Sequence, residues 1–141
     1  MERALRSSAT VLVIDDDIEI CEALEVALTI EGYAVRVAYD ESLALEIAAS
    51  EPLALIMLDY HGLGSDTQQI VERLRAIDPN VPIVLMSGIN NPARRAKDLG
   101  LKRFLAKPFD INALRKVLDE TIRSPRKKPV RRSNVEFSLF S

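Results

Sequence analysis

The chain has 141 residues, of which 48% are hydrophobic, 28% charged and only 5% aromatic, and its formal net charge is −2 at pH 7. This profile predicts one globular domain with an aliphatic core and argues against a disordered chain. No apolar stretch approaches the roughly 18 residues of a membrane span, residues 1–9 lack a signal-peptide core, and the single cysteine, Cys21, permits no internal disulfide, so we expect a cytoplasmic protein.

Short apolar runs and helical patterns alternate along the chain. The runs that predict strands cover, in chain order, residues 10–14, 33–38, 53–59, 81–86 and 102–106. The third run holds six consecutive apolar residues before Asp59, which is typical of a strand buried on both faces of a parallel sheet. Apolar residues at helical spacing follow each run, so the sequence predicts five strand-and-helix units.

Capping residues and glycines predict where the helices begin and end. The predicted starts are Asp40, a Ser65-x-x-Gln68 capping box, Asn91-Pro92 and Asp110, and the predicted ends are Gly32 and Gly100. The periodicity predicts apolar inward faces on the helices. Their members include Ile20, Leu24, Leu28, Leu43, Ile47, Ile70, Leu74, Ile77, Ile111, Leu114, Val117, Leu118 and Ile122, and Cys21 is expected in the core.

Five units in strict alternation predict an α/β fold of the flavodoxin-like (βα)5 type. Parallel strands need crossover helices, and these crossovers are right-handed, so helices should cover both faces of a doubly wound sheet. The strand order most compatible with five such units is 2-1-3-4-5. Its switch point lies between the first and third strands, and ligands of such sheets bind at the carboxyl ends of the strands.

Four of the predicted strands bring polar side chains to this edge of the sheet. They are Asp15 and Asp16 from the first strand, Asp59 from the third, Ser87 from the fourth and Lys107 from the fifth. Like charges about 4 Å apart repel by roughly 4 kcal/mol at an effective dielectric near 20, so three carboxylates require a cation. Such oxygen ligands suit Mg²⁺. With an ammonium and a hydroxyl nearby, the pattern predicts a carboxylate site that accepts a phosphoryl group on Asp59.

The residues that carry this prediction resemble the receiver domain of response regulators in two-component signalling. The matching segments are VLVIDDD at 11–17, LIMLD at 55–59, VLMSG at 84–88 and FLAKPF at 104–109. The resemblance runs from about Thr10 to Ile122, and all motifs fall in the expected order. It implies that Asp59 is phosphorylated from the phosphohistidine of a sensor histidine kinase or a histidine phosphotransferase.

The resemblance also implies a role for each site residue. Asp16, Asp59 and the backbone carbonyl of His61 would ligate Mg²⁺, and Asp15 would act through water. Lys107 would pair with the acyl phosphate, and its peptide bond to Pro108 would be cis.

A switch is implied as well. Ser87 would bond the phosphoryl group and move toward it, and Phe104 would turn inward to follow. This movement would remodel the face of the fourth helix, fifth strand and fifth helix, where a downstream protein or a second copy could bind.

The loop after Asp59 departs from the family pattern, because Gly62-Leu63-Gly64 replaces the usual apolar residue and proline. An alternative is therefore a pseudo-receiver that binds proteins without being phosphorylated. A small phosphohydrolase is the other alternative, but the sequence has no substrate-pocket signature or cap segment. We expect autocatalytic phosphoryl acceptance and hydrolysis, and no enzyme that processes a diffusible metabolite.

The predicted organisation is an N-terminal extension at 1–9, a receiver domain at 10–123 and a flexible basic tail at 124–141. The tail carries a net charge of +4, which leaves −6 on the preceding body. Val135, Phe137 and Leu139 alternate with other residues, so this part could add to a sheet edge or dock on a partner. No helix-turn-helix pattern is present, and direct DNA binding is not expected.

Overall fold

The five apolar runs form the five parallel strands of one sheet, in the order β2-β1-β3-β4-β5. The computed structural model describes residues 9–60, 66–88 and 91–123. The strands are β1 (Thr10–Ile14), β2 (Ala34–Ala38), β3 (Leu55–Asp59), β4 (Ile83–Ser87) and β5 (Arg103–Ala106). The predicted strand order and the doubly wound fold are therefore confirmed, and β1 and β3 are neighbours at the switch point.

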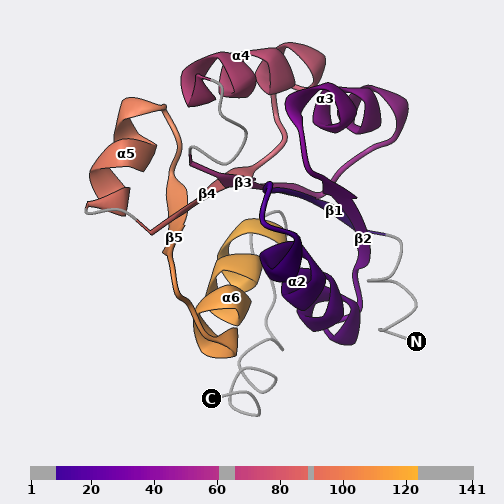
Figure 1. Ribbon diagram of the computed structural model, residues 1–141, viewed down its shortest axis with the longest axis vertical. Coiled ribbons are helices and arrows are strands. Elements are labelled where there is room, and N and C mark those ends of the chain that lie inside the picture. Colours follow the sequence, from indigo (N-terminus) through magenta and orange to yellow (C-terminus); the bar gives the residue numbers. More distant parts are fainter. Residues whose placement is uncertain (1–8, 61–65, 89–90, 124–141) are drawn as a thin grey trace.

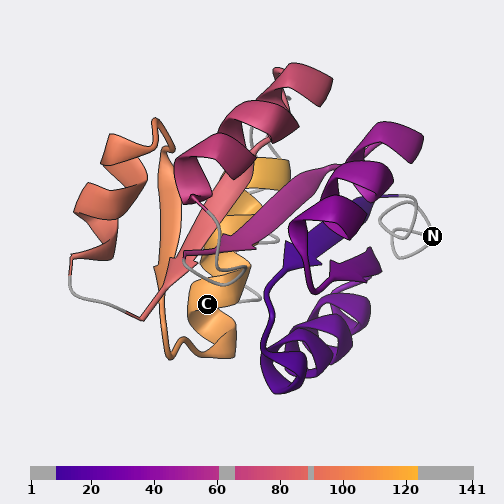
Figure 2. The same cartoon turned by 45° about the horizontal axis from the view of Figure 1, so that its top comes forward.

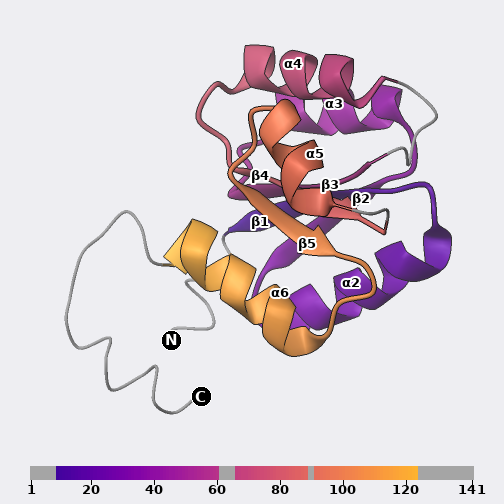
Figure 3. The same cartoon turned by 90° about the vertical axis from the view of Figure 1, so that its left-hand side faces the viewer.

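Helices cover both faces of this sheet. They are α2 (Ile18–Ile30), α3 (Glu41–Ser50), α4 (Thr67–Ile77), α5 (Pro92–Asp98) and α6 (Ile111–Leu118), which continues into the π-helical turn η1 (Asp119–Arg123). Helices α2 and α6 lie side by side on one face, and α3, α4 and α5 lie on the other (Figures 1 and 3). Among the described residues, no helix has the length and hydrophobicity needed to cross a membrane.

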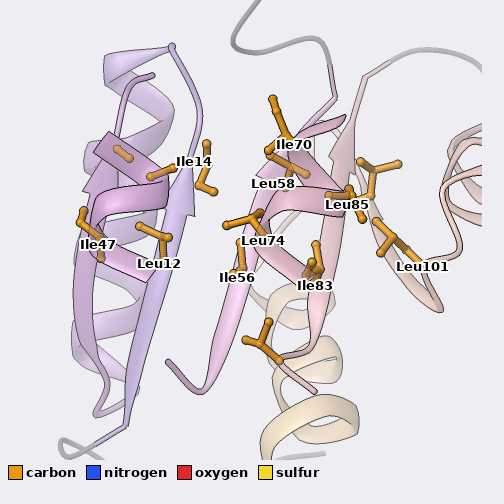
Figure 4. Close-up of a cluster of buried hydrophobic side chains, with 14 of the residues drawn as sticks. Leu12, Ile14, Ile47, Ile56, Leu58, Ile70, Leu74, Ile83, Leu85 and Leu101 are labelled. Atoms are coloured by element: carbon orange, nitrogen blue, oxygen red, sulfur yellow. The ribbon is translucent and has the colours of Figure 1, made fainter. Parts of the chain in front are cut away.

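The strands of the sheet centre are apolar on both sides because both of their faces are covered. Leu12, Ile14, Ile56 and Leu58 belong to the buried cluster on the side of α3 and α4, which Figure 4 shows. Their neighbours in the strands, such as Val13 and Met57, belong to the cluster on the side of α2 and α6. Figure 2 shows β3 and β4 running between the two helical layers. Residues that follow these strands therefore emerge at one edge of the sheet.

Short polar side chains begin the helices, mostly as predicted. Asp40 and Asp110 accept hydrogen bonds from the backbone N–H groups of Leu43 and Ala113, at 2.8 Å and 2.9 Å. The predicted capping box at Ser65 is wrong for α4, because Asp66 caps this helix by accepting from the N–H of Gln68 at 2.9 Å. Ser65 and Asp66 are consecutive residues of types that cap helices, and the carboxylate of Asp66 accepts a hydrogen bond from an N–H group of the first turn. Ser65 itself lies outside the described residues.

Three residues that the periodicity placed on inward faces are exposed instead. They are Leu43, Ile77 and Ile111, with relative exposures of 38% to 39%. Each lies within one turn of a helix end. Gly32 and Gly100 have φ angles of 101° and 75°, which explains why glycines follow α2 and α5.

Candidate carboxylate site at the sheet edge

Four strands bring their polar residues to one edge of the sheet. Asp15 follows β1, Asp59 ends β3, Ser87 ends β4 and Lys107 follows β5. The strand register brings these ends together: Ile14 pairs with Leu58, Asp59 with Met86 and Ser87 with Ala106. The backbone N–H of Lys107 donates to the carbonyl of Ser87 at 2.8 Å, so the ladder continues to the lysine.

The ammonium of Lys107 bridges two carboxylates. Its Nζ lies 2.6 Å from Oδ1 of Asp59 and 2.9 Å from Oδ2 of Asp15. The side chains of Lys107, Asp59 and Asp15 are only 18%, 11% and 1% exposed. Because water screens these charges little, the two charge-assisted hydrogen bonds are strong. They fix the positions of both carboxylates.

Asp16 adds a third carboxylate to the site. Oxygens of Asp15, Asp16 and Asp59 lie within 4.8 Å of one another, and Asp15 is buried whereas Asp16 is exposed. One lysine cannot balance the charge of three carboxylates. The excess negative charge is on carboxylate oxygens, and those of Asp16 are exposed to solvent. This donor set fits a divalent cation such as Mg²⁺, which takes one or two carboxylates and keeps waters.

The loop that carries Asp15 and Asp16 is held by its own hydrogen bonds. The N–H of Asp17 donates to Oδ1 of Asp15 at 2.9 Å. Asp17 also caps α2, because its Oδ1 accepts from the N–H groups of Glu19 and Ile20. The three consecutive aspartates therefore have distinct surroundings, and the third of them anchors the helix.

Burial and the neighbouring charges shift the ionisation of the central pair. Burial raises the pKa of Asp59, and the hydrogen bond from Lys107 opposes this effect without cancelling it. Burial acts to lower the pKa of Lys107, but the hydrogen bonds to Asp59 and Asp15 outweigh it, so this pKa lies above its ordinary value. The lysine therefore stays charged throughout the physiological pH range.

The structure describes some of the other predicted site residues but not all of them. Ser87 is buried at the same edge, and Phe104 of β5 is exposed, so its ring lies on the outside of the sheet edge. The peptide bond between Lys107 and Pro108 is cis, as the resemblance implied. His61 and Gly62-Leu63-Gly64 lie outside the described residues.

Cys21 is buried in the core, as predicted, and its Sγ donates to the backbone carbonyl of Asp15 at 3.3 Å. Burial and the nearby carboxylates raise the pKa of this thiol to about 12. A thiol with a raised pKa stays protonated and unreactive until the pH approaches that value. We therefore expect no alkylation of Cys21 in the folded protein at pH 8, and full alkylation after unfolding in denaturant. Rapid labelling of the folded protein in a mass measurement would contradict this expectation.

Gly88 follows Ser87, and a Cβ atom there would meet only the Cβ of Lys107, at 3.6 Å. This is an ordinary contact, so we expect Gly88→Ala to change the free energy of unfolding by no more than about 0.5 kcal/mol. Gly100→Ala is the matched control: it has open space but a φ of +75°, and we expect a loss of about 1 kcal/mol there. Urea unfolding of both variants measures the two changes. An equal loss of unfolding free energy in Gly88→Ala and Gly100→Ala would contradict the predicted difference.

One contact beside the site was missed by the sequence analysis. The guanidinium of Arg95 in α5 lies over the ring of Tyr60, 5.4 Å from its centroid, and its Nη1 is 3.5 Å from the hydroxyl oxygen. Tyr60 directly follows Asp59, so the contact links the end of β3 to α5. Residues 35 positions apart carry no pairing signal in a single sequence, although an aromatic residue after Asp59 could have prompted a search for a cation.

A comparison with known families gives a match to the response regulator receiver domain over residues 11–119. Sporulation initiation phosphotransferase F of Bacillus subtilis is 33% identical over 107 residues, which cover 74% of this chain and 86% of that protein. Transcriptional regulatory protein TctD of Salmonella typhimurium is 34% identical over 105 residues, which cover 73% of this chain and 47% of that protein. Of the other curated relatives, the chain spans between about a quarter and a half.

Solved structures give the same picture. The chemotaxis protein CheY4 of Vibrio cholerae superposes with a TM-score of 0.74 at 27% identity, covering 81% of this chain and 98% of that one. The receiver domain of NtrX from Brucella abortus gives a TM-score of 0.73 at 28% identity, with the same coverage of both chains. The described residues thus share the fold of these two proteins.

Proposed function

The chain belongs to the response regulator receiver domain family, and we propose that it is a switch that is phosphorylated on Asp59. The observation that carries the proposal is the bridge from Lys107 to Asp59 and Asp15 inside a cluster of three carboxylates. A carboxylate held at the carboxyl edge of a sheet, beside a fixed ammonium, is suited to covalent phosphoryl transfer.

In the proposed reaction, an oxygen of Asp59 attacks the phosphorus of a phosphohistidine in a sensor histidine kinase or a histidine phosphotransferase. The new bond is an acyl phosphate, the P–N bond of the donor breaks, and the imidazole leaves and takes up a proton. Lys107 keeps its charge, so its ammonium can turn from the carboxylate of Asp59 to a phosphoryl oxygen. The hydroxyl of Ser87 supplies a hydrogen-bond donor to the same group.

We propose that Asp16, Asp59 and the backbone carbonyl of His61 hold Mg²⁺, with Asp15 acting through water. When bound, the ion neutralises negative charge on the phosphoryl oxygens. The loop carrying Asp15 and Asp16 is already fixed by Asp17, so this chain presents its carboxylates before the ion arrives. A preorganised site of this kind loses little entropy on binding.

The proposed output is a change of the face formed by α5, β5 and α6. Phe104 is exposed on β5, at the centre of this face, and would turn inward when Ser87 moves toward the phosphoryl group. The contact between Arg95 and Tyr60 ties α5 to the residue after Asp59, so α5 can respond to the same event. A downstream protein or a second copy would bind there. We assign this switch to residues 10–123.

Intact mass after incubation with Mg²⁺ and a small acyl-phosphate donor tests the proposal. We expect the parent protein to gain one phosphoryl group and Asp59→Asn to gain none. Asp98→Asn is the matched control, because this exposed aspartate of α5 lies outside the carboxylate cluster and its variant should still be phosphorylated.

A parent protein that binds Mg²⁺ but gains no phosphoryl group from either the acyl phosphate or a phosphohistidine donor would favour the pseudo-receiver alternative. Steady release of phosphate from a generic phosphate ester would instead favour the phosphohydrolase. Neither is expected, because the family consists of signalling modules and the acyl phosphate forms once per cycle.

A further inference from the structure

An apolar groove lies between α2 and α6, directly beside the carboxylate site. Its volume is about 530 Å³, and its wall includes Ala23 and Ala27 of α2, Ile111 and Leu114 of α6, and Lys107. Figures 1 and 3 show these two helices side by side beneath the sheet. Because Lys107 also donates to Asp59, the groove and the site share one wall.

The outer side of α2 extends the apolar surface of the groove. Val26 and Ile30 are 60% and 62% exposed. They stand three residues after Ala23 and Ala27, so all four side chains lie on one stripe of the helix. An exposed apolar stripe that continues an apolar groove is typical of a surface where another segment binds.

Every charged residue of α2 is acidic, whereas α6 carries Lys116 and Arg115, the second of which pairs with Glu31 at 2.8 Å. Helix α2 contains no lysine or arginine, and its exposed charged residues are Glu19, Glu22 and Glu25. A segment that fills the groove and passes over the outer side of α2 should therefore combine apolar side chains with positive charge on the α2 side. Such complementarity selects one occupant over others.

Residues 124–141 have this combination. Five basic residues between positions 126 and 132 precede Val135, Phe137, Leu139 and Phe140. Two of the four phenylalanines of the whole chain are in this short stretch, whereas segments that remain in solvent have few aromatic residues. We propose that residues 135–140 dock in the groove between α2 and α6 of the same chain, with the basic stretch beside the glutamates of α2.

The chain is long enough for this docking. From Ile111 to Arg123, α6 and η1 extend about 20 Å at the rise of a helix, so residue 124 begins about that far from the groove. A flexible linker of 11 residues, the number from 124 to 134, would have a mean reach of about 18 Å. When the mean reach of a linker matches the span, the effective concentration of the tethered segment is at its maximum.

The edge of β5 is a poorer place for the same segment. The hollow along β5 and α6 carries both signs of charge, Lys102, Arg103 and Lys116 against Asp110 and Glu120, so it does not attract the basic stretch as the acidic α2 does. Parallel pairing with β5 is also disfavoured. Because α6 lies on the same face as α2, adding a strand beyond β5 would need a left-handed crossover, whereas nearly all such crossovers are right-handed.

The docked segment would lie against the side of the site that Lys107 forms. If the proposed function holds, residues 135–140 would then lie beside Lys107, which donates to Asp59. The docking itself does not depend on phosphorylation, so it can be tested separately.

A spin label at position 141 tests the proposal on the full chain. Cys21 is buried with a raised pKa, so Ser141→Cys supplies the only reactive thiol. We expect strong loss of amide NMR signal near Ala23, Ala27 and Ile111, and no loss in α3 and α4 on the opposite face. Equal signals in all helices would overturn the proposal.

Two changes should restore the lost signals. Phe137→Ser combined with Phe140→Ser removes the apolar side chains of the segment. Ala23→Arg places bulk and positive charge in the groove, and Ala49→Arg, on the exposed side of α3, is its matched control and should restore nothing. Persistence of the signal loss in Ala23→Arg would contradict docking in this groove.

The remaining question is whether the segment docks within one chain. Mixing isotope-labelled chain without a spin label with unlabelled chain that carries one detects only contacts between copies. We expect no signal loss in this mixture. Signal loss in the mixture would show contacts between copies. If dilution also reduced the signal loss in the chain that carries both labels, the segment would dock on a second copy and not within its own chain.

Discussion

Replacing Lys107 by methionine is expected to lower the free energy of unfolding by about 3 kcal/mol at pH 7 without divalent ions. Methionine keeps most of the aliphatic volume but removes the ammonium between Asp59 and Asp15. These two carboxylates are 11% and 1% exposed, so they would face each other with little water to screen them. Lys102→Met, at an exposed position before β5, is the control and should change the free energy of unfolding little.

The loss should depend on pH in a predictable direction. Burial already raises the pKa of Asp59, and without the lysine the pKa of this carboxyl in the folded protein should rise further above its unfolded value near 3.9. A raised pKa contributes stability that is present below the unfolded pKa and is lost as the pH rises through the folded pKa. We therefore expect the difference between variant and parent to be small near pH 4 and full at pH 7.

Two further measurements show whether the lost charge or the lost packing causes the stability loss of Lys107→Met. Millimolar Mg²⁺ should restore most of the lost stability of Lys107→Met, because the ion can replace the missing positive charge. Adding Asp59→Asn to Lys107→Met should also restore part of it, since the two substitutions act on the same contact and are not additive. A loss that is the same at both pH values and indifferent to Mg²⁺ would show that packing, not charge, is responsible.

The fold could be predicted from the sequence because its strands are locally distinct. The run before Asp59 is apolar at every position, and its short length between Pro52 and a glycine-containing loop favours a strand covered on both faces. Alternation with helices then leaves few topologies once crossovers are right-handed. The helix ends were less certain. Ser65 and Asp66 are both good caps, and only the three-dimensional path of the chain decides which of them begins α4.

The sequence could predict which residues of the candidate site meet at one edge of the sheet, but not which of their atoms are in contact. Asp15, Asp59, Ser87 and Lys107 were expected together because parallel strands end on the same side. The sequence did not indicate that one ammonium touches both Asp15 and Asp59, or that Cys21 donates to the carbonyl of Asp15. Such contacts depend on side-chain conformations and on the twist between strands. The pairing of Tyr60 with Arg95 depends on where α5 packs, which periodicity cannot specify.

Leu58→Ala is expected to lower the free energy of unfolding by about 3 to 4 kcal/mol, as a leucine deleted from a rigid core does. Leu58 is fully buried in the central strand β3, between β1 and β4, and directly precedes Asp59. The buried cluster around Leu58 includes residues of β1, β4, α3 and α4, which limits how far the cavity can collapse.

Leu43→Ala is the control variant with which the stability loss of Leu58→Ala is compared. The sequence predicts both residues to be buried, Leu43 from helical periodicity and Leu58 from a continuous apolar run, but Leu43 is 38% exposed at the start of α3. Its truncation leaves no closed cavity, so we expect a loss of less than about 1 kcal/mol. Urea unfolding of both variants compares them directly. Similar losses would mean that Leu43 packs as periodicity predicts, and a small loss at Leu58 would mean that the strand carrying Asp59 is less rigidly packed than its burial indicates.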